Sequence, residues 1–232
     1  MRQKIASITQ GLRIPAVCAL CHHYHNSIFA VCEQCTNLLT RIGPGCSTCR
    51  LPLVDNLFMQ CGYCIKNKPA FDNVLSSYCY EEPLKTLLHD FKYQEALYLL
   101  TFMTRLMLDA RPPSYQTDCL VPVPMHPLRL RERGFNQSAE LTKFLAKRLK
   151  IPFDLNLCEK KTNTVAQVNL NGKHRRLNLV NAFTAKPTAY QHITLIDDLL
   201  TTGSTANELA RTLKQQGVAR VDVWCLARTT TI

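Results

Sequence analysis

Two kinds of apolar pattern run through the chain from residue 71 onward. Helix periodicity, with apolar side chains at spacings of three and four, recurs in four stretches: residues 83–94, 95–110, 136–150 and 206–217. Short apolar runs typical of buried strands lie between and around them: residues 74–80, 118–124, 151–156, 192–197 and 219–228. Strands that alternate with helices predict a parallel sheet covered by helices, so we expect an α/β fold. In such a sheet, ligands bind at the carboxyl ends of the strands.

The first 70 residues follow neither pattern and are rich in cysteine. Eight of the chain's 12 cysteines form pairs with two residues between the members: Cys18/Cys21, Cys32/Cys35, Cys46/Cys49 and Cys61/Cys64. This spacing forms a tight knuckle that directs both sulfur atoms at one metal ion, and two knuckles complete a tetrahedron. We therefore expect two structural zinc sites, whose metal stabilises a segment with few apolar residues. We assign no role to the four single cysteines: Cys79, Cys119, Cys158 and Cys225.

The cysteine-rich segment leaves alternatives open. The simplest pairing is sequential, with the first four cysteines on one zinc ion and the last four on the other; crossed pairing is the alternative. His22, His23 and His25 could replace a cysteine ligand, although we expect them to be bystanders. A disulfide framework is the other interpretation, which we disfavour because no secretory signal precedes the cysteines.

The charge of the chain suggests a polyanionic partner. The formal net charge is +11, and it is concentrated in residues 125–176, which carry 12 Lys or Arg against 4 Asp or Glu. Such a segment favours nucleic acid or phosphorylated ligands, and a solvated basic surface is the plainer alternative. No apolar run approaches the roughly 18–20 residues of a membrane span, so we expect no transmembrane segment.

The stretch "ITLIDDLLTTGSTANELARTL" combines an apolar strand, two carboxylates and a hydroxyl-rich turn. Asp197 and Asp198 at the strand end could accept hydrogen bonds from ribose hydroxyls and help to hold magnesium. The turn that follows leads into a helix, whose amino end favours a phosphate. It consists of Thr201, Thr202, Gly203, Ser204 and Thr205. Ribose-binding acids before a phosphate cradle match phosphoribosyl pyrophosphate; an ordinary capped helix after two solvated acids is the alternative.

Two of these stretches resemble known families. "ITLIDDLLTTGST" resembles the phosphoribosyl pyrophosphate motif of type I phosphoribosyltransferases. "VPVPMHPLRLRERGFNQ", together with the four knuckles, resembles the ComF competence family over nearly the whole chain. The resemblance implies a double zinc-binding domain in residues 1–70 and a phosphoribosyltransferase-like domain in residues 71–232.

The resemblance also implies a biological setting. It suggests a cytoplasmic protein that handles single-stranded DNA during natural transformation and binds phosphoribosyl pyrophosphate with magnesium. Other competence or DNA-processing proteins are the implied partners, and recruitment to the inner membrane is left open. An enzymatic reaction does not follow from the resemblance.

The same resemblance assigns individual residues. Asp197 and Asp198 would hold the ribose, and residues 201–205 the 5′-phosphate. Pyrophosphate would meet Met125 and His126 after their strand, with charge from Arg133; Lys92 could reach a phosphate or simply extend into solvent. Nucleic-acid contacts are expected from basic residues in and near an expected lid over residues 159–183, which could equally be a disordered loop. These are Arg129, Arg131, Lys160, Lys161, Arg175 and Arg176.

Three functions remain open from the sequence. The first is a DNA-handling protein with a phosphoribosyl pyrophosphate site. The second is an active phosphoribosyltransferase with an unidentified acceptor, although no residue stands out as a general base. The third is a sensor or adaptor that binds the ligand without turnover.

Overall fold

The computed structural model describes residues 15–53, 58–94, 96–161 and 181–230, so the predictions for Arg175, Arg176 and most of the expected lid lie outside the described residues. The helices are α2 (Glu33–Asn37), α3 (Gly62–Lys66), α4 (Leu84–Tyr93), the 3₁₀ turn η1 (Leu97–Leu99), α5 (Leu100–Leu108), α6 (Pro127–Arg133), α7 (Gln137–Leu149) and α9 (Ser204–Gln215). The strands are β1 (Ala16–Val17), β2 (Tyr24–His25), β3 (Asn73–Leu75), β4 (Tyr78–Cys79), β5 (Cys119–Pro122), β6 (Cys158–Lys160), β7 (Phe183–Ala185), β8 (His192–Leu200) and β9 (Arg220–Arg228).

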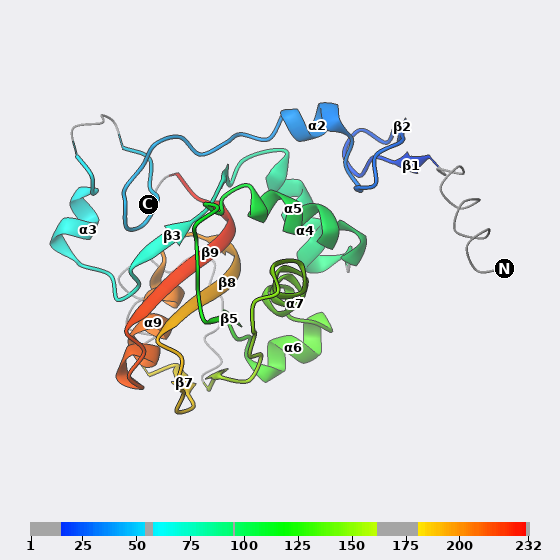
Figure 1. Cartoon of the computed structure of the whole chain (residues 1–232). Coiled ribbons are helices and arrows are strands. Elements are labelled where there is room, and N and C mark those ends of the chain that lie inside the picture. Colours follow the sequence, from blue (N-terminus) through cyan, green and yellow to red (C-terminus); the bar gives the residue numbers. More distant parts are fainter. Residues whose placement is uncertain (1–14, 54–57, 95, 162–180, 231–232) are drawn as a thin grey trace.

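A parallel sheet with the strand order β3-β9-β8-β5 forms the centre of the fold (Figure 1). Strand β4 extends the β3 edge, because it also pairs with β9. The two long strands pair in parallel from His192 opposite Arg220 to Leu200 opposite Arg228. Both are buried over most of their length, which explains why they are nearly continuous apolar runs. The expected parallel α/β fold is confirmed.

Helices cover both faces of this sheet. On one face, α5 and α7 pack on the strands, and α4 contributes Leu84, Leu87, Leu88 and Phe91 to the same core. Trp224 of β9 anchors this layer, since its indole Nε1 donates to the carbonyl oxygen of Met107 at 3.0 Å. On the other face lies α9, in contact with β9 and with β7 of the small β6–β7 pair.

The cysteine-rich segment is divided between the two sides of the sheet. Cys18, Cys32 and Cys35 belong to the core that contains α4, α5 and α7. Phe29 lies beside Phe102 of α5, with ring centroids 6.3 Å apart, and Arg105 stacks over Phe29. The last four knuckle cysteines belong instead to the core that contains α9. Each half of the segment therefore packs on a different layer of the α/β fold.

Some predicted elements differ from the structure. The strand expected over residues 151–156 is wrong, because only Phe153 forms a bridge, to Leu120 of β5, and Pro152 has no N–H to donate. The helix expected from residue 95 begins as the turn η1 and becomes α-helical at Leu100. None of the described helices combines the length and the apolarity that a membrane crossing requires.

Candidate metal centres and phosphate-binding site

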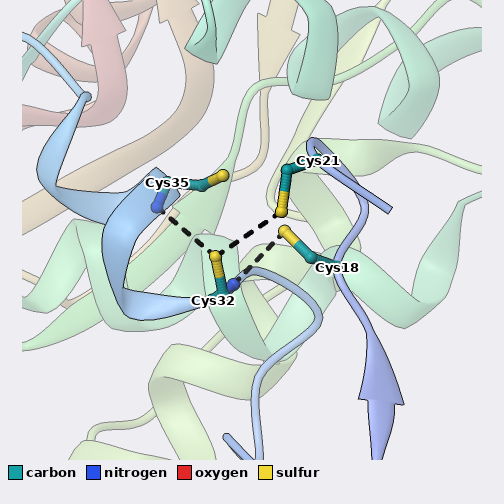
Figure 2. Close-up of side chains that lie close together, drawn as sticks. All are labelled: Cys18, Cys21, Cys32 and Cys35. Atoms are coloured by element: carbon teal, nitrogen blue, oxygen red, sulfur yellow. Dashed lines mark hydrogen bonds between the residues drawn. The ribbon is translucent and has the colours of Figure 1, made fainter. Parts of the chain in front are cut away.

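The eight knuckle cysteines gather into two separate groups, in each of which all Sγ atoms lie within 4.8 Å of one another. The first cysteine centre consists of Cys18, Cys21, Cys32 and Cys35 (Figure 2), and the second of Cys46, Cys49, Cys61 and Cys64. The Sγ atoms of Cys21 and Cys32 are 3.8 Å apart, and those of Cys49 and Cys61 are 3.7 Å apart. A tetrahedral zinc ion with Zn–S bonds of about 2.3 Å requires a sulfur–sulfur separation of about 3.8 Å. Both centres fit zinc, and the sequential pairing is confirmed.

Backbone N–H groups prepare the sulfur atoms for a metal ion. The N–H groups of Leu20 and Cys32 each donate to Cys18 Sγ at 3.4 Å. In the second knuckle of each centre, the N–H of Cys35 donates to Cys32 Sγ and that of Cys64 to Cys61 Sγ, both at 3.4 Å. Burial acts to raise the pKa of Cys18, but hydrogen bonds from backbone N–H groups outweigh it and lower this pKa to about 6. The thiolate, the form that binds zinc, is therefore favoured at Cys18, whereas burial raises the pKa of Cys35, Cys49 and Cys64.

The structure disfavours the alternatives to a four-cysteine site. The 12 cysteines are free thiols, and the separations of 3.8 Å and 3.7 Å are far longer than a disulfide bond of about 2.05 Å. Among the described residues, no histidine belongs to either metal-binding group. His25 instead accepts a hydrogen bond from the N–H of Ser27 at its Nδ1, at 3.1 Å.

Asp197 and Asp198 lie near the end of β8 and contact two different helices. Asp197 Oδ1 accepts hydrogen bonds from Ser138 Oγ of α7 at 3.1 Å and from the N–H of Asp198 at 2.9 Å. Asp198 Oδ1 lies 2.9 Å from Lys92 Nζ at the end of α4, and both side chains are largely buried. The strand continues to Leu200, three residues beyond the predicted end. The structure thus brings the predicted acids together with Lys92.

The two acids differ in their electrostatics. Burial, followed by the repulsion of Asp198, raises the pKa of Asp197 from 3.8 to about 7, against the attraction of Lys92. Desolvation acts to lower the pKa of Lys92, but the Asp198 carboxylate outweighs it and the pKa is raised. Near neutral pH, the site therefore holds an ion pair beside a carboxylate that readily exchanges its proton. Carboxylate oxygens are the ligands that magnesium prefers.

The loop 201–205, which consists of the turn after β8 and the first two residues of α9, suits an anion. Gly203 has φ +76°, a left-handed conformation that glycine adopts without strain, and a Cβ atom there would meet the Phe71 ring at 3.5 Å. The hydroxyl oxygens of Thr202 and Ser204 are 2.9 Å apart. Gly203 at the N-cap of α9 has no side chain to cap the helix, and only a long hydrogen bond of 3.4 Å joins the N–H of Ser204 to Thr202 Oγ1. The following N–H groups and the helix dipole favour a phosphate.

A cationic cavity of about 350 Å³ lies beside Lys92, the ion-pair partner of Asp198. It is lined by Lys92, Tyr93, Arg129, Glu132 and Arg133. Arg133 stacks over the Tyr93 ring, with its Cζ 4.9 Å from the ring centroid, and no ion pair in the described ranges includes Arg129 or Arg133. The cations outnumber the single acid, so the cavity suits a multiply charged anion.

Lys160 interacts electrostatically with Arg129, one of the cations that line this cavity. Burial lowers the pKa of Lys160, and the charge of Arg129 lowers it further. Lys160 lies over the Phe183 ring, with Nζ 5.7 Å from the centroid. The repulsion between Lys160 and Arg129 would be relieved by a bound phosphate. Arg131 and Lys161, in contrast, are exposed.

Residues 125–133 form more regular structure than the sequence predicted. Met125 and His126 are partly buried between β5 and α6. His126 caps α6, since its Nδ1 accepts from the N–H of Leu128 at 3.2 Å, and Pro127 occupies the first turn. The predicted pyrophosphate contacts of Met125 and His126 stay predictions.

The sequence did not identify two residues at this site. Ser138 contacts Asp197, which is 59 positions away in the sequence, and the residues that flank Ser138 in the sequence do not predict this contact. Arg228 ends an apolar strand, which is a weak signal, and its guanidinium donates to the carbonyl oxygens of Leu200 and Thr201 beside the loop 201–205.

Comparison with known proteins identifies the family. No family model matches the chain. It is 33% identical over 208 residues to competence protein F of Haemophilus influenzae, covering 85% of this chain and 90% of that protein. It is 32% identical over 229 residues to DNA utilization protein YhgH of Escherichia coli K12, covering 94% and 99%. Competence protein ComFC of Streptococcus pneumoniae is 24% identical over 205 residues, covering 88% and 90%.

One solved structure also shows a partial likeness. Glutamine phosphoribosylpyrophosphate amidotransferase from B. subtilis, complexed with ADP and GMP, matches 53% of this chain and 25% of its own, with 15% identity and a TM-score of 0.35. The sequence relatives are the stronger comparison, because they align over nearly their full length. On these identities, the chain belongs to the ComF family of competence and DNA utilization proteins.

Proposed function

We propose that the protein binds phosphoribosyl pyrophosphate with magnesium at the end of β8 and handles single-stranded DNA that enters the cytoplasm. The observation that carries this proposal is the order of three features around Asp198. An acid pair precedes the amino end of α9, where Gly203 provides no side-chain cap, and its Asp198 contacts Lys92, which lines a cavity with Arg129 and Arg133. A ribose with a 5′-phosphate on one side and a pyrophosphate on the other needs the same order.

Each group of the ligand has a chemical counterpart in this arrangement. The carboxylates of Asp197 and Asp198 accept hydrogen bonds from the ribose hydroxyls, and the first N–H groups of α9 bind the 5′-phosphate. Arg129 and Arg133 neutralise the pyrophosphate. Magnesium, when bound, would be held by the carboxylates of Asp197 and Asp198 and would offset the charge of the phosphates. Lys92 Nζ lies 2.9 Å from Asp198 in the ligand-free arrangement and is the cation that a phosphate would draw toward the cavity.

The DNA part of the proposal is supported by the relatives, whose names refer to competence and DNA utilization. Phosphates of a single strand would contact Arg129, Arg131, Lys160 and Lys161. Tyr93 contacts Arg133 and the His89 ring, whose centroid lies 5.1 Å away, but it is 63% exposed and is the candidate for base stacking. Because the two ligands would share the cationic cavity, DNA and phosphoribosyl pyrophosphate should compete.

Isothermal titration calorimetry with phosphoribosyl pyrophosphate and magnesium tests the first part. The wild-type protein should bind, and the double variant Asp197→Ala/Asp198→Ala should not, while keeping its fold by circular dichroism. Glu140→Ala is the matched control. The Glu140 carboxylate pairs with Lys143 at 2.7 Å, so its removal should leave the affinity unchanged. Unchanged affinity in the double variant would show that the acid pair is not the ribose site.

Fluorescence anisotropy with a labelled oligonucleotide tests the second part. Single-stranded DNA should bind at low salt, and phosphoribosyl pyrophosphate should displace it. No binding at low salt would contradict the DNA part alone. Incubation with labelled phosphoribosyl pyrophosphate and a panel of acceptors then separates turnover from simple binding.

A further inference from the structure

Arg228, at the end of β9, is a buried cation, with only 1% of its surface exposed. No ion pair within the described ranges includes it. Its guanidinium instead donates to oxygen atoms: Nη1 to the carbonyls of Leu200 at 3.2 Å and Thr229 at 3.1 Å, to that of Thr201, and to Thr229 Oγ1 at 3.0 Å. A buried charge without a carboxylate partner is costly, so its surroundings should supply a counter-charge.

The second cysteine centre is a source of that counter-charge. Arg228 Nε donates to the carbonyl oxygen of Cys49 at 3.1 Å, and Cys49 is one of the four sulfur ligands of this centre. Four thiolates around Zn²⁺ carry a net charge of −2. Arg228 therefore joins a dianionic metal centre to Leu200, the last residue of β8, and to Thr201, the first residue of the loop 201–205.

A cavity of about 290 Å³ confirms that the metal centre and the loop are neighbours. Cys49, Cys64 and Arg228 line one part of its wall, and Thr202, Gly203 and Ser204 line another. Residues that are far apart in sequence thus face a common space. Any shift of the Cys49 knuckle changes where Arg228 holds the carbonyls of Leu200 and Thr201.

We propose that Arg228 is a positioning residue that couples the second cysteine centre to the loop 201–205, so that an intact second centre is required for the loop to bind a phosphate. The first cysteine centre belongs to the opposite layer, where Phe29, between its two knuckles, packs against Phe102 and Arg105 of α5. It has no such connection among the described contacts and provides an internal control. The test by phosphate binding rests on the proposed function, whereas the coupling between the second cysteine centre and the loop 201–205 does not.

Two probes read the two ends of the site separately. Ribose 5-phosphate reports on the loop 201–205, and inorganic pyrophosphate with magnesium reports on the cavity of Arg129 and Arg133. Arg228→Gln, which removes the charge, should weaken ribose 5-phosphate binding by about tenfold or more, as expected for lost hydrogen bonds from a charged donor. Pyrophosphate binding should not change. Arg228→Lys, which keeps the charge, should recover part of the affinity.

The cysteine variants test the metal side of the coupling. Cys49→Ser and Cys35→Ser should each lower the zinc content by about one ion per chain, because each opens one four-cysteine site. Only Cys49→Ser should weaken ribose 5-phosphate binding. Equal affinity in Cys49→Ser and the wild type, or an equal loss for both probes in Arg228→Gln, would overturn the coupling.

Amide hydrogen exchange gives a readout that needs no ligand. Exchange in residues 199–206 should accelerate in Cys49→Ser and Arg228→Gln, and should stay at the wild-type rate in Cys35→Ser. Unchanged protection in the first two variants would overturn the proposal. If the wild type binds neither probe, the proposed function fails, while the exchange pattern still decides whether the second centre orders the loop.

Discussion

Replacing Asp197 by asparagine should stabilise the protein at neutral pH, whereas the same change at Asp198 should destabilise it. The pKa of Asp197 is raised in the folded protein by burial and by the neighbouring Asp198 carboxylate, from 3.8 to about 7. Between these two pH values, the unfolded chain releases the proton of Asp197 before the folded chain does. The stability present at low pH is therefore lost as the pH rises toward 7.

The size of this effect follows from the pKa difference. A rise from 3.8 to about 7 corresponds to about 4 kcal/mol, since each pH unit contributes about 1.4 kcal/mol. We expect about half of this, roughly 2 kcal/mol, because Asp197 keeps partial contact with water and its ionisation is linked to that of Asp198. In a chain of this size, 2 kcal/mol raises the Tm by about 4–8 °C.

Asp198→Asn acts in the opposite direction. It removes the carboxylate that lies 2.9 Å from Lys92 Nζ and leaves a largely buried ammonium group without its ion-pair partner. Breaking a buried pair in this way costs about 3–5 kcal/mol when the remaining charge stays buried, and less where Lys92 can turn toward water. Both variants should nevertheless lose the binding of phosphoribosyl pyrophosphate with magnesium, because each removes an oxygen ligand.

Thermal unfolding of both variants at pH 5 and pH 8 provides the measurement. The stability advantage of Asp197→Asn over the wild type should grow between these pH values, and comparison at each pH cancels the contribution of the metal centres. Calorimetry at pH 8 gives the ligand affinities. An Asp197→Asn variant that is less stable than the wild type at pH 8 would refute the reasoning that the ionised Asp197 carboxylate destabilises the folded protein.

Three further predictions concern the metal centres, the basic surface and the loop. Elemental analysis of the native protein should find about two zinc ions per chain, and a value close to one would contradict two closed sites. Arg129→Glu with Lys160→Glu should flatten the slope of log K against log salt for single-stranded DNA by about 1–2, since each neutralised phosphate contributes about −0.7; an unchanged slope would place the DNA elsewhere. Gly203→Val should lower the free energy of unfolding by about 1–2 kcal/mol, because a side chain is strained at a φ of +76°, and it should weaken ribose 5-phosphate binding. Chemical denaturation measures the first effect and calorimetry the second. An unchanged free energy of unfolding would contradict the backbone strain expected at this position.

The parts of the fold that could be predicted are those with local signals. The cysteine spacing gave the metal knuckles, and the pairing became certain only when the structure brought Cys21 beside Cys32. Alternating strands and helices gave the parallel sheet, and the acid pair stood out because two carboxylates followed an apolar run. The order of strands in the sheet had no local signal.

The contacts that escaped prediction join distant positions of the chain. Lys92 meets Asp198, and Arg228 meets Cys49 across 179 positions. The strand expected over residues 151–156 failed for a different reason: its apolar residues cover the edge of β5 through backbone bonds of Leu120 without forming a continuous ladder. The short helix α6 had a recognisable signal in Pro127, which occupies the first turn after its cap.

The strand order has a consequence for folding. β9 comes after β3 and β8 in the sequence, yet it lies between them in the sheet. Until its nine residues are in place, β3 has no partner among the described strands and one edge of β8 stays open. Any intermediate that forms before β9 pairs therefore carries unpaired, apolar strand edges, which are prone to aggregate. A deletion within β9 would remove the middle of the sheet rather than an edge.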